Sequence, residues 1–447
     1  MARAKKEAAL TPEDRLQAAL VPDWERPYKL PENWCWTTVG AINQYVGISA
    51  DPTKAKNKTF ELYSVPSSAD NYPEIVLGAD IGSTKQSVKK GDVLLCKINP
   101  RINRVWKVSK YTDHSLLASS EWIVIRNSGL ISNYLMWCFR SPYFRGYMLS
   151  NVSGVGGSLM RAQPKFVQGY PVPVPPLAEQ QRIVDRIESL FAKLDEAKEK
   201  AQAVVDSFET RKAAILHKAF TGELTAKWRE EHGVSIDNWK TTRFDSVAAI
   251  RSNLVDPAEY QSFPHIAPDN IEKKTGVLLE YHTIAEDGVT SGKHRFYSGQ
   301  ILYSKIRPYL SKAVVVDFDG LCSADMYPIE AYQNARCLWY YMLSDEFLLQ
   351  ASTAGSRSVL PKINQKELSA LTVHLPTNDR EQEEIARILD ELFDKEQQTK
   401  EAAEIVLDQI DLMKKSILAR AFRGELGTND PSEESAVELL KEIIRRG

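Results

Sequence analysis

Apolar residues recur at alternating spacings of four and three in two long segments of the chain. In the first segment these positions are Ile183, Ile187, Leu190, Leu194, Ala197, Ala201, Val204 and Phe208. In the second they are Ile385, Leu389, Leu392, Ala403, Val406, Ile410, Met413 and Ile417, with Glu396 and Thr399 at two positions of the same series. This heptad pattern is typical of coiled-coil helices. About 40 residues at ~1.5 Å per residue would make each helix ~60 Å long.

The ends of both segments carry helix boundary signals. Each begins after prolines, Pro175-Pro176 or Pro376, where a helix can start. Each ends near a glycine, Gly222 or Gly424, which suits a helix C-terminus. Ordinary core helices are an alternative, but these are usually only ~11–12 residues long. The pattern favours two long helices that pair antiparallel, with the polar residues at 396 and 399 either setting the register or facing a partner chain.

The two segments belong to a larger internal repeat. Adding 202 to the numbering aligns residues 179–227 with 381–429 without a gap. The identical pairs include Glu179/Glu381, Gln180/Gln382, Phe191/Phe393, Phe220/Phe422 and Gly222-Glu223-Leu224/Gly424-Glu425-Leu426. Upstream, Asn33-Trp34 pairs with Asn238-Trp239, and GDVLLCKINPR (91–101) pairs with GQILYSKIRPY (299–309). The chain is therefore predicted to contain one unit twice, a variable region followed by a long helix.

The variable regions show a strand-like pattern. Short runs of β-branched and aromatic residues (VLLCKI, EWIVIR, ILYSKI and KAVVVDF) are bounded by Gly, Pro, Asp and Ser. Residues 134–149 and 337–350 are each predicted to form one amphipathic helix with an aromatic-rich buried face. We therefore expect an α+β fold with two α/β domains, each of about 140 residues, separated by the two long helices.

Charge is unevenly distributed along the chain. The totals of 57 Lys/Arg and 59 Asp/Glu nearly cancel. Residues 36–175, however, carry 16 basic and 8 acidic side chains, residues 239–376 carry 14 and 15, and residues 379–447 carry 11 and 18. The excess of eight positive charges in the first region suits a polyanion such as DNA. The second region would have to gather its cations on one face.

Candidate DNA contacts lie in and around equivalent strand–turn segments of the two regions. Lysine, arginine and tyrosine in a turn can contact phosphates and base edges, although solvated turn residues would give the same pattern. Glycine-rich loops at 154–158 and 355–358 each precede a basic residue and could follow a DNA backbone or act as linkers. The candidates are Lys85, Lys97, Arg101, Arg104, Lys107, Arg161, Lys293, Arg295, Lys305, Arg307, Tyr309, Arg357 and Lys362.

The sequence contains none of the catalytic motifs that would indicate an enzyme. No G-x-x-x-x-G-K-[ST] or H-E-x-x-H sequence occurs, and Asn99-Pro100 is followed by Arg101, which breaks the pattern of an amino-methyltransferase. The five cysteines form no C-x-x-C pair and the seven histidines no ligand-spaced pair, so no metal site is expected. No membrane span or signal peptide is apparent, and we expect a reduced, cytoplasmic protein that binds without catalysing.

The order of these features resembles the specificity (S) subunits of type I restriction–modification enzymes. The resemblance rests on the duplicated E-Q helices with A-F-x-G-E-L endings and on the N-W openings, and it covers essentially the whole chain. It implies two target recognition domains, each reading one half of a bipartite, asymmetric double-stranded DNA site. It also implies that the helices set the spacer and dock two methyltransferase subunits, through which restriction subunits join. S-adenosylmethionine, ATP and Mg would then be bound by the partners, and the chain itself would hold no cofactor.

The resemblance also supplies domain boundaries. They are an N-terminal segment at 1–29, recognition domains at 30–177 and 234–377, helices at 178–225 and 378–426, and a tail at 427–447. Val437, Leu439, Leu440, Ile443 and Ile444 predict a short amphipathic helix in the tail, packed on the N-terminal segment or on a partner. Two alternatives remain open: a non-catalytic coiled-coil spacer between proteins and, less favoured, a stand-alone nuclease or methyltransferase.

Overall fold

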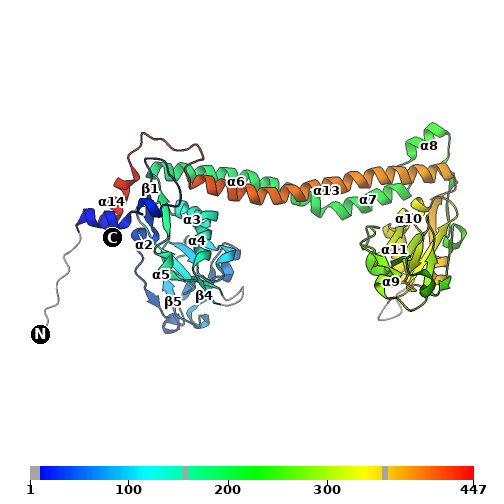
Figure 1. The fold of residues 1–447 in the computed structure, drawn as a ribbon, viewed down its shortest axis with the longest axis horizontal. Helices are drawn as coiled ribbons and strands as arrows, with labels where there is room; N and C mark the ends of the chain where they lie inside the picture. The colour runs from blue at the N-terminus through cyan, green and yellow to red at the C-terminus, as the bar shows by residue number, and fades with distance from the viewer. Residues whose placement is uncertain (1–10, 155–159, 355–360, 447) are drawn as a thin grey trace. The chain divides into compact units, whose positions relative to one another are not determined.

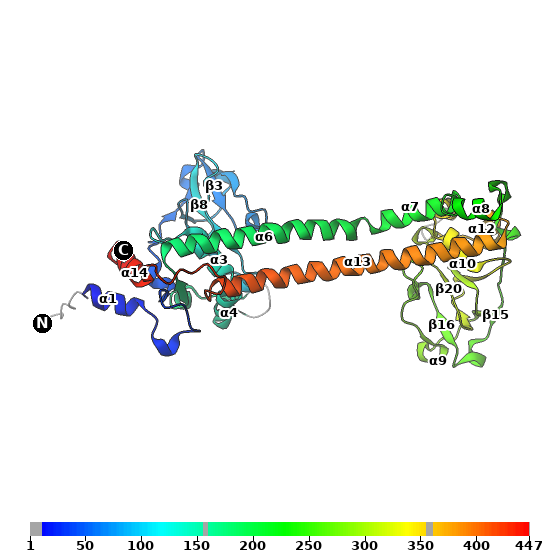
Figure 2. The ribbon, with the colours of Figure 1, turned by 90° about the horizontal axis from the view of Figure 1, so that it is seen from above.

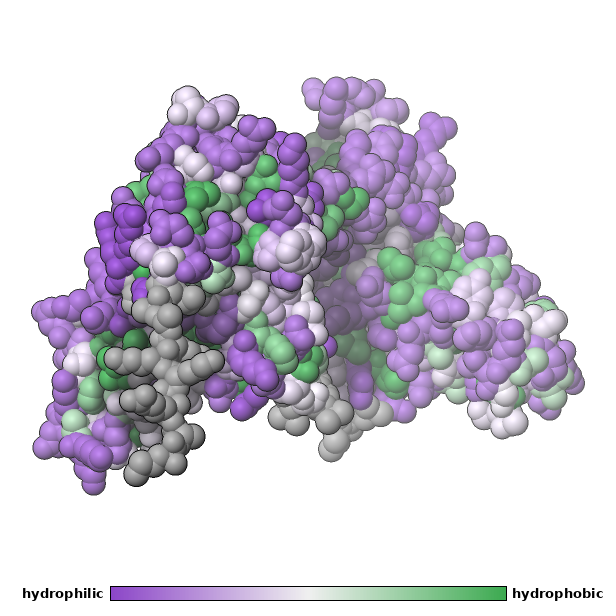
Figure 3. Space-filling model, turned by 60° about the vertical axis from the view of Figure 1, so that its left-hand side comes forward, coloured by the Kyte–Doolittle hydropathy of each residue, from purple (hydrophilic) through white to green (hydrophobic). Residues whose placement is uncertain are grey.

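The structure is a computed structural model that describes residues 11–154, 160–354 and 361–446. These residues form two compact units. Unit 1 comprises Met1–Lys200 and Val406–Gly447, and unit 2 comprises Ala201–Ile405. Two long helices, α6 (Leu177–Asp206) and α13 (Asp379–Ala421), each contribute residues to both units (Figure 1). Hydrophilic side chains cover most of the face seen in Figure 3, and apolar residues gather there in small patches.

The described residues of unit 1 form four short sheets and six further helices besides the long ones. The helices are α1 (Pro12–Ala19), α2 (Val39–Ile42), α3 (Ser132–Arg140), α4 (Pro142–Ser150), α5 (Pro164–Val167) and α14 (Ala436–Arg446). The strands are β1 (Cys35–Thr38), β2 (Ser49–Ala50), β3 (Thr59–Tyr63), β4 (Glu74–Leu77), β5 (Lys85–Ser87), β6 (Val93–Cys96), β7 (Val105–Lys107), β8 (Ser115–Ala118), β9 (Trp122–Ile125), β10 (Val152–Ser153), β11 (Arg161–Ala162) and β12 (Pro171–Val174).

Unit 2 contains the second variable region together with α7, the last part of the first long helix, and the α7–β13 connection. Its helices are α7 (Phe208–Phe220), α8 (Ala226–His232), α9 (Ile284–Asp287), α10 (Ala335–Met342), α11 (Asp345–Ala354) and α12 (Gln365–Ala370). Its strands are β13 (Trp239–Arg243), β14 (Ala248–Ile250), β15 (Leu254–Val255), β16 (Pro264–Ile266), β17 (His282–Thr283), β18 (Lys293–Phe296), β19 (Ile301–Ser304), β20 (Ala313–Val315), β21 (Gly320–Cys322), β22 (Met326–Ala331) and β23 (Thr372–Pro376).

The sheets show that the repeat extends to topology. The five-stranded sheet has the order β2-β5-β8-β3-β4 in unit 1 and β15-β18-β21-β16-β17 in unit 2, and each contains one parallel pair at its third and fourth strands. A second sheet has the order β7-β6-β9 in unit 1 and β20-β19-β22 in unit 2, where β14 extends it. The predicted α+β class with two related domains is therefore confirmed.

A two-stranded sheet brings the beginning and the end of each variable region together. In unit 1, β1 pairs antiparallel with β12, and in unit 2, β13 pairs with β23 in the same way. Both β12 and β23 lead directly into a long helix. Because the two ends of each region lie side by side at a helix start, the region can vary in length and sequence without moving that helix.

Each region also packs a helix against the coiled coil through an aromatic pair. In unit 1, Trp137 of α3 contacts Phe191 of α6, with ring centroids 5.1 Å apart. In unit 2, Tyr340 of α10 contacts Phe393 of α13 at 5.5 Å. The ammonium group of a lysine from the paired helix lies over each phenylalanine ring, Lys414 in unit 1 and Lys212 in unit 2. These phenylalanines and lysines are the repeat-related positions 191/393 and 212/414.

The long helices run antiparallel within each unit (Figure 2). In unit 1, Lys198 pairs with Asp411 at 3.7 Å, and Lys414 pairs with Asp195. In unit 2, Arg211 donates to Glu396 at 2.7 Å. Residue numbers therefore rise along one helix as they fall along the other, which confirms the predicted antiparallel pairing. The polar residue Glu396 in the predicted seam has its partner on the facing helix.

Most predicted seam residues lie against the other helix or the domain core. Ile183, Ile187, Ala201, Phe208, Ile385, Leu389 and Ile410 are buried, and Leu190, Leu194, Val204, Leu392 and Ile417 are partly buried. The predictions for Val406 and Met413 are wrong, because their side chains are 40% and 47% exposed. Between Ala403 and Ile410 the inward position is Leu407, since a helix of 3.6 residues per turn drifts from a strict 3.5-residue repeat.

Three predicted helices are interrupted. The first long helix is broken at Ser207, whose hydroxyl donates to the carbonyl of Ala203 at 2.6 Å, a bond that competes with regular helix geometry. The helix predicted at 134–149 is two helices, because Ser141 caps α4 and Pro142 begins it. Residues 337–350 likewise divide into α10 and α11.

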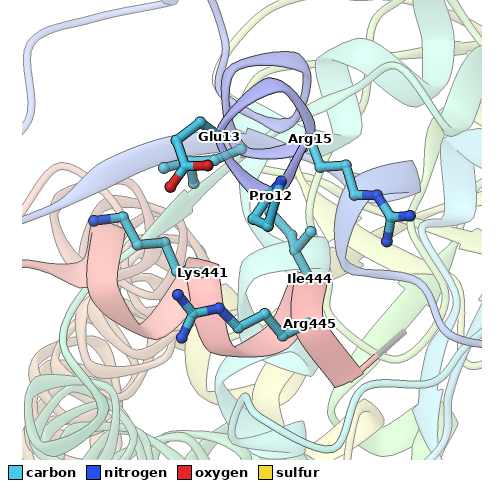
Figure 4. A pocket seen from close by; sticks show the side chains of 7 residues that line it. Pro12, Glu13, Arg15, Lys441, Ile444 and Arg445 are labelled. Atoms are coloured by element: carbon cyan, nitrogen blue, oxygen red, sulfur yellow. The ribbon is translucent and has the colours of Figure 1, made fainter. Parts of the chain in front are cut away.

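The tail forms helix α14 and packs on the N-terminal helix α1, as predicted. Its buried side chains are Ala436, Leu440 and Ile443. A pocket of about 170 Å³ remains between the two helices, with cationic side chains around it (Figure 4). Its lining residues are Pro12, Glu13, Arg15, Leu16, Lys441, Ile444 and Arg445.

A fully buried glutamate stands at the beginning of each long helix. In unit 2, Glu381 accepts hydrogen bonds from Thr225, Arg229, Asn238 and the indole of Trp239, at 2.7 to 3.0 Å. These donors come from the α7–β13 connection. The hub of unit 2 is defined here as these five residues.

In unit 1 the corresponding glutamate, Glu179, accepts from Thr428 at 2.6 Å and from Arg182 at 3.0 Å, and Arg182 forms a bidentate pair with Glu433. The indole of Trp34 donates to Asn429 at 2.9 Å. The hub of unit 1, defined as these six residues, therefore joins the N-terminal segment to the tail. In unit 2 the partners of the glutamate come from the continuous α7–β13 connection. In unit 1 the junction is instead completed by contact between the N-terminal segment and the tail.

The neighbouring glutamine ties each helix to its own variable region. Gln180 donates to the carbonyl of Pro175 and accepts from the amide of Ile131 at 3.0 Å each. Gln382 repeats both contacts, with Pro376 at 2.7 Å and Asn334 at 3.2 Å. The repeated E-Q pair thus has a physical reason: the glutamate organises the junction, and the glutamine orients the domain.

The two hub glutamates have pKa values shifted in opposite directions. Burial raises the pKa of the Glu179 carboxyl, against the lowering effect of its bonds to Thr428 and Arg182. Burial acts on Glu381 in the same direction, but the hydrogen bonds from Asn238, Arg229, Trp239 and Thr225 outweigh it and lower the pKa of that carboxyl. The number of hydrogen-bond donors around each carboxylate therefore decides the direction of its pKa shift.

We expect Glu381→Gln and Glu179→Gln to change the pH dependence of stability in opposite directions. The folded pKa of Glu381 lies below 4.5, so its contribution is present above pH 4.5 and is lost as pH falls through that folded value. The folded pKa of Glu179 lies above 4.5, so its contribution is present below pH 4.5 and is lost as pH rises. Urea denaturation from about pH 3 to about pH 7 measures both. Parallel curves for the two variants would contradict the assignment.

Candidate nucleic-acid interface

A one-turn helix with unusual flanking residues follows the equivalent strands β6 and β19. In unit 1 it comprises Pro100–Ile102, between Asn99 (φ 44°) and Asn103 (φ 54°). In unit 2 it comprises Pro308–Leu310, between Arg307 (φ 50°) and Ser311 (φ 46°). Left-handed backbone is tolerated by asparagine and costs about 1–2 kcal/mol for other side chains. Arg307 therefore occupies a strained position, which often marks a functional site.

A second segment of each variable region returns to this turn and is hydrogen-bonded to it. In unit 1 the amide of Asn99 donates to Met160 and that of Ala162 donates to Lys97, both at 2.8 Å. In unit 2 the amide of Arg307 donates to Pro361 at 2.8 Å and that of Ile363 donates to Lys305 at 2.9 Å. These bonds bring Arg161 and Lys362, from the ends of the glycine-rich loops, beside the turns.

An acidic residue stands between the two cations at each turn. In unit 1, Glu121 lies 3.9 Å from the ammonium of Lys97 and 3.4 Å from the guanidinium of Arg161. Lys97 also donates to the carbonyl of Ser120 at 2.8 Å. We define the first platform as Lys97, Arg101, Glu121 and Arg161. Arg101 is its exposed tip.

Unit 2 repeats this arrangement with different side chains. Asp325 lies 3.8 Å from the ammonium of Lys305 and 3.2 Å from that of Lys362, and Lys305 donates to the carbonyl of Ala324 at 2.5 Å. The second platform is defined as Lys305, Arg307, Asp325 and Lys362. Tyr309 lies on the same turn and is 47% exposed. The structure thus brings together six of the predicted cations, three in each unit.

The backbone shows which residues of the two turns are equivalent. With the constant offset of 208, Lys97 corresponds to Lys305, as the sequence indicated. Arg101 corresponds to Tyr309, however, and Arg307 to Asn99. The two turns therefore present different side chains at equivalent positions.

Other predicted contacts lie outside the platforms. Lys85 and Lys293 are equivalent residues that donate to Ser83 and Ser291, and burial lowers the pKa of both ammonium groups. Lys293 is only 7% exposed, which argues against direct contact with DNA. Lys107 donates to Asn133 of α3 at 2.5 Å.

Two further candidates have aromatic or thiol neighbours. The Arg295 guanidinium lies 4.9 to 5.9 Å from the rings of Tyr260, Phe263 and Tyr297. Arg104 lies beside the thiol of Cys96. Burial raises the pKa of this thiol, and the positive charge of Arg104 acts to lower it. Arg357 and most of both glycine-rich loops lie outside the described residues.

Sequence reasoning missed the acidic members of the platforms. Glu121 and Asp325 precede strands β9 and β22, at an offset of 204 rather than 208. The residues predicted as DNA contacts were basic, apart from one tyrosine, and no carboxylate in the same strand–turn segments was among them. A useful signal was nonetheless present, because an acidic residue occurs shortly before an equivalent strand in both copies.

The described residues contain no group of three or more His, Cys, Asp or Glu side chains suited to binding a metal ion. All five cysteines are buried and unpaired. None of the described helices has the length and apolarity to cross a membrane.

Comparison with known proteins identifies the relatives of this chain. The model of the type I restriction modification DNA specificity domain matches residues 47–205 and 236–406. The specificity subunit of the type I restriction enzyme EcoDI from Escherichia coli is 36% identical over 370 residues, which are 76% of this chain and 82% of that protein. The EcoKI specificity subunit from Escherichia coli (strain K12) is 23% identical over 463 residues, covering 93% and 96%.

Solved structures show the same fold. The HsdS subunit from Thermoanaerobacter tengcongensis aligns with a TM-score of 0.63 at 20% identity. A chain from a study of complex assembly and conformational transition in the type I R-M system aligns with a TM-score of 0.69 at 20% identity. Each alignment covers 90% of this chain and 100% of the other.

Exchanging the residues that begin the two turns should have opposite effects on stability. Arg307→Asn places in unit 2 the residue that unit 1 has, relieves the left-handed strain and should raise the free energy of unfolding by about 0.5–1 kcal/mol. Asn99→Arg should lower it by a similar amount. Chemical denaturation measures both changes, and the same sign for both variants would contradict the argument.

Proposed function

Because the chain belongs to the family of type I restriction–modification specificity subunits, we propose that each of its units reads one half of a bipartite, asymmetric double-stranded DNA site. Such subunits are non-catalytic members of their complexes, and the chain offers DNA recognition rather than chemistry. No observation on the described residues favours the alternatives, a plain protein spacer or a stand-alone nuclease or methyltransferase.

The observation that carries this proposal is the duplicated platform. In each unit a rigid turn and a returning segment gather three basic side chains, a composition that suits contact with phosphates. The tips differ, Arg101 in one unit and Tyr309 in the other. Arginine pairs with guanine in the major groove, whereas tyrosine forms other contacts, so different tips suit different half-sites.

The platforms also explain how the second region, which has no excess of positive charge, could contact DNA. Its net charge is near zero, but Lys305 and Arg307 beside the turn and Lys362 on the returning segment gather with a single carboxylate. Local concentration of cations matters more for a phosphate contact than the net charge of a domain. We therefore extend the same DNA-binding proposal to both units.

The test is a map of methylated adenines in a host that expresses the chain with its methyltransferase subunits. A split motif with two defined halves and a fixed gap is the expected result. Arg101→Ala should relax or weaken one half only, and Arg307→Ala the other, because each residue belongs to one platform. Lys227→Ala, at an exposed lysine of α8, is the matched control. Loss of both halves by one platform variant, with the protein still folded, would contradict independent reading.

The same map tests the proposed role of the paired helices as a ruler. We propose that α6–α7 and α13 set the gap between the half-sites. Because the helices pair antiparallel, seven residues are inserted in both, which preserves the heptad seam. The gap should lengthen while both halves stay the same. An unchanged gap in an active, folded variant would refute the ruler.

The exposed face of α13 is the proposed docking surface for a methyltransferase subunit. Val406 and Met413 are 40% and 47% exposed and lie seven residues apart on one side of the helix, and Leu412, next to Met413, is 62% exposed. Such an apolar stripe suits an amphipathic helix from a partner. We propose that two methyltransferase subunits bind, that restriction subunits join through them, and that S-adenosylmethionine, ATP and Mg are bound by these partners.

Leu412→Asp should therefore abolish or strongly reduce copurification of the methyltransferase, because a charge would be buried in the apolar contact. Lys227→Asp, at an exposed lysine of α8 outside this surface, should leave copurification unchanged. Equal recovery of the methyltransferase with Leu412→Asp and wild type would place docking elsewhere.

A further inference from the structure

Each platform contains one carboxylate whose position invites a functional explanation. Glu121 and Asp325 lie between a lysine from the strand and a basic residue from the returning segment. The strand lysines already have carbonyl partners, at Ser120 and Ala324. The carboxylates are therefore not the only acceptors beside those ammonium groups.

The geometry in unit 1 is that of an incompletely satisfied acceptor. Oε2 of Glu121 is buried and has no hydrogen-bond partner, and it lies 3.9 Å from the Lys97 ammonium, beyond hydrogen-bond distance. Oε1 lies 3.4 Å from Arg161, whose side chain is 53% exposed. A buried carboxylate oxygen without a donor costs free energy, so a purely structural role would leave this arrangement unexplained.

The same arrangement has been built twice from different residues. Unit 1 uses glutamate with lysine and arginine, whereas unit 2 uses aspartate with two lysines. The carboxylates precede equivalent strands, and the cations come from equivalent turns and returning segments. Only the strand lysine is the same residue type in both units, yet each unit keeps one anion between two cations. This repetition indicates that the charge pattern itself has a role.

We propose that Glu121 and Asp325 occupy the positions of DNA phosphates in the free protein and compete with those phosphates for the platform cations. A carboxylate and a phosphate offer similar oxygen acceptors to lysine and arginine. In the free protein the carboxylate would hold the two cations near their binding positions and neutralise part of their charge. When DNA binds, the cations would exchange the carboxylate for phosphate oxygens.

This exchange would set how tightly the chain binds DNA of any sequence. Phosphate contacts carry no sequence information, and unopposed cations would hold the protein on the large excess of unrelated DNA. An internal competitor lowers that affinity, so that a long-lived complex depends on base contacts. The inference rests on the proposed function, because it assumes that the platforms meet DNA.

The experiment uses the full chain in complex with its methyltransferase subunits. Binding to two duplexes, one with the mapped site and one without it, is measured for Glu121→Gln and Asp325→Asn, which keep shape and remove one negative charge. Each variant should bind both duplexes about 3–5-fold more tightly, because the loss of a partly exposed ion-pair competitor is worth up to about 1 kcal/mol. The rise should be equal for the two duplexes.

Matched controls separate this effect from a general change in charge. Asp113→Asn and Asp245→Asn make the same change at exposed ion pairs with Lys110 and Arg243, outside the platforms, and should alter affinity less. In an Arg161→Ala background, Glu121→Gln should have a smaller effect, because one of the competing cations is gone. A purely structural glutamate would show no such coupling.

The outcomes are distinguishable. Unchanged or weaker binding by the folded variants, judged by circular dichroism and melting temperature, would overturn the competitor and make the carboxylates structural. An equal rise in the control variants would also overturn it. If Glu121→Gln does not fold, Asp325→Asn decides. A wild-type complex that binds neither duplex would instead refute the proposed function itself.

Discussion

The structure depends on the burial of one glutamate at the start of each long helix. An ionised carboxylate removed from water must be surrounded by donors, and leaving it unpaired would cost several kcal/mol. Glu381 draws its donors from the N-cap of α8, from α8 itself and from the residues at the start of β13. One charge therefore fixes the helix, the connection and the first strand together. Glu179 imposes the same requirement in unit 1, and Gln180 and Gln382 orient the variable regions on that frame.

This frame allows sequence variation where recognition takes place. Each variable region begins and ends in a two-stranded sheet beside a helix start, so changes within it need not alter the junction. The platforms lie on turns and returning segments of these regions, fixed by backbone hydrogen bonds that any side chain permits. The strained backbone of Arg307 is tolerated because Pro361 and the following turn hold it in place. A rigid frame with exchangeable tips is the arrangement expected of a recognition module.

The repeat, the long helices and the α+β character were predictable from sequence because they depend on periodicity and identity. The break at Ser207 and the split at Ser141-Pro142 depend on single polar or cyclic side chains that a periodic pattern averages out. Val406 was assigned to the wrong side because a small angular drift accumulates along a helix. The platform cations were predictable by residue type. Burial of Lys293 and the positions of Glu121 and Asp325 were not, since they follow from tertiary packing.

The hub of unit 1 has a consequence for the order in which the protein is made. In unit 2 every hub residue has left the ribosome once α13 has begun, so that junction can close during synthesis. In unit 1 the partners of Trp34 and Glu179 are Asn429 and Thr428, which are translated almost four hundred and about two hundred fifty residues later. The first domain to be synthesised is thus the last to be completed. A chain that stops before residue 428 therefore lacks the partners that close its first junction.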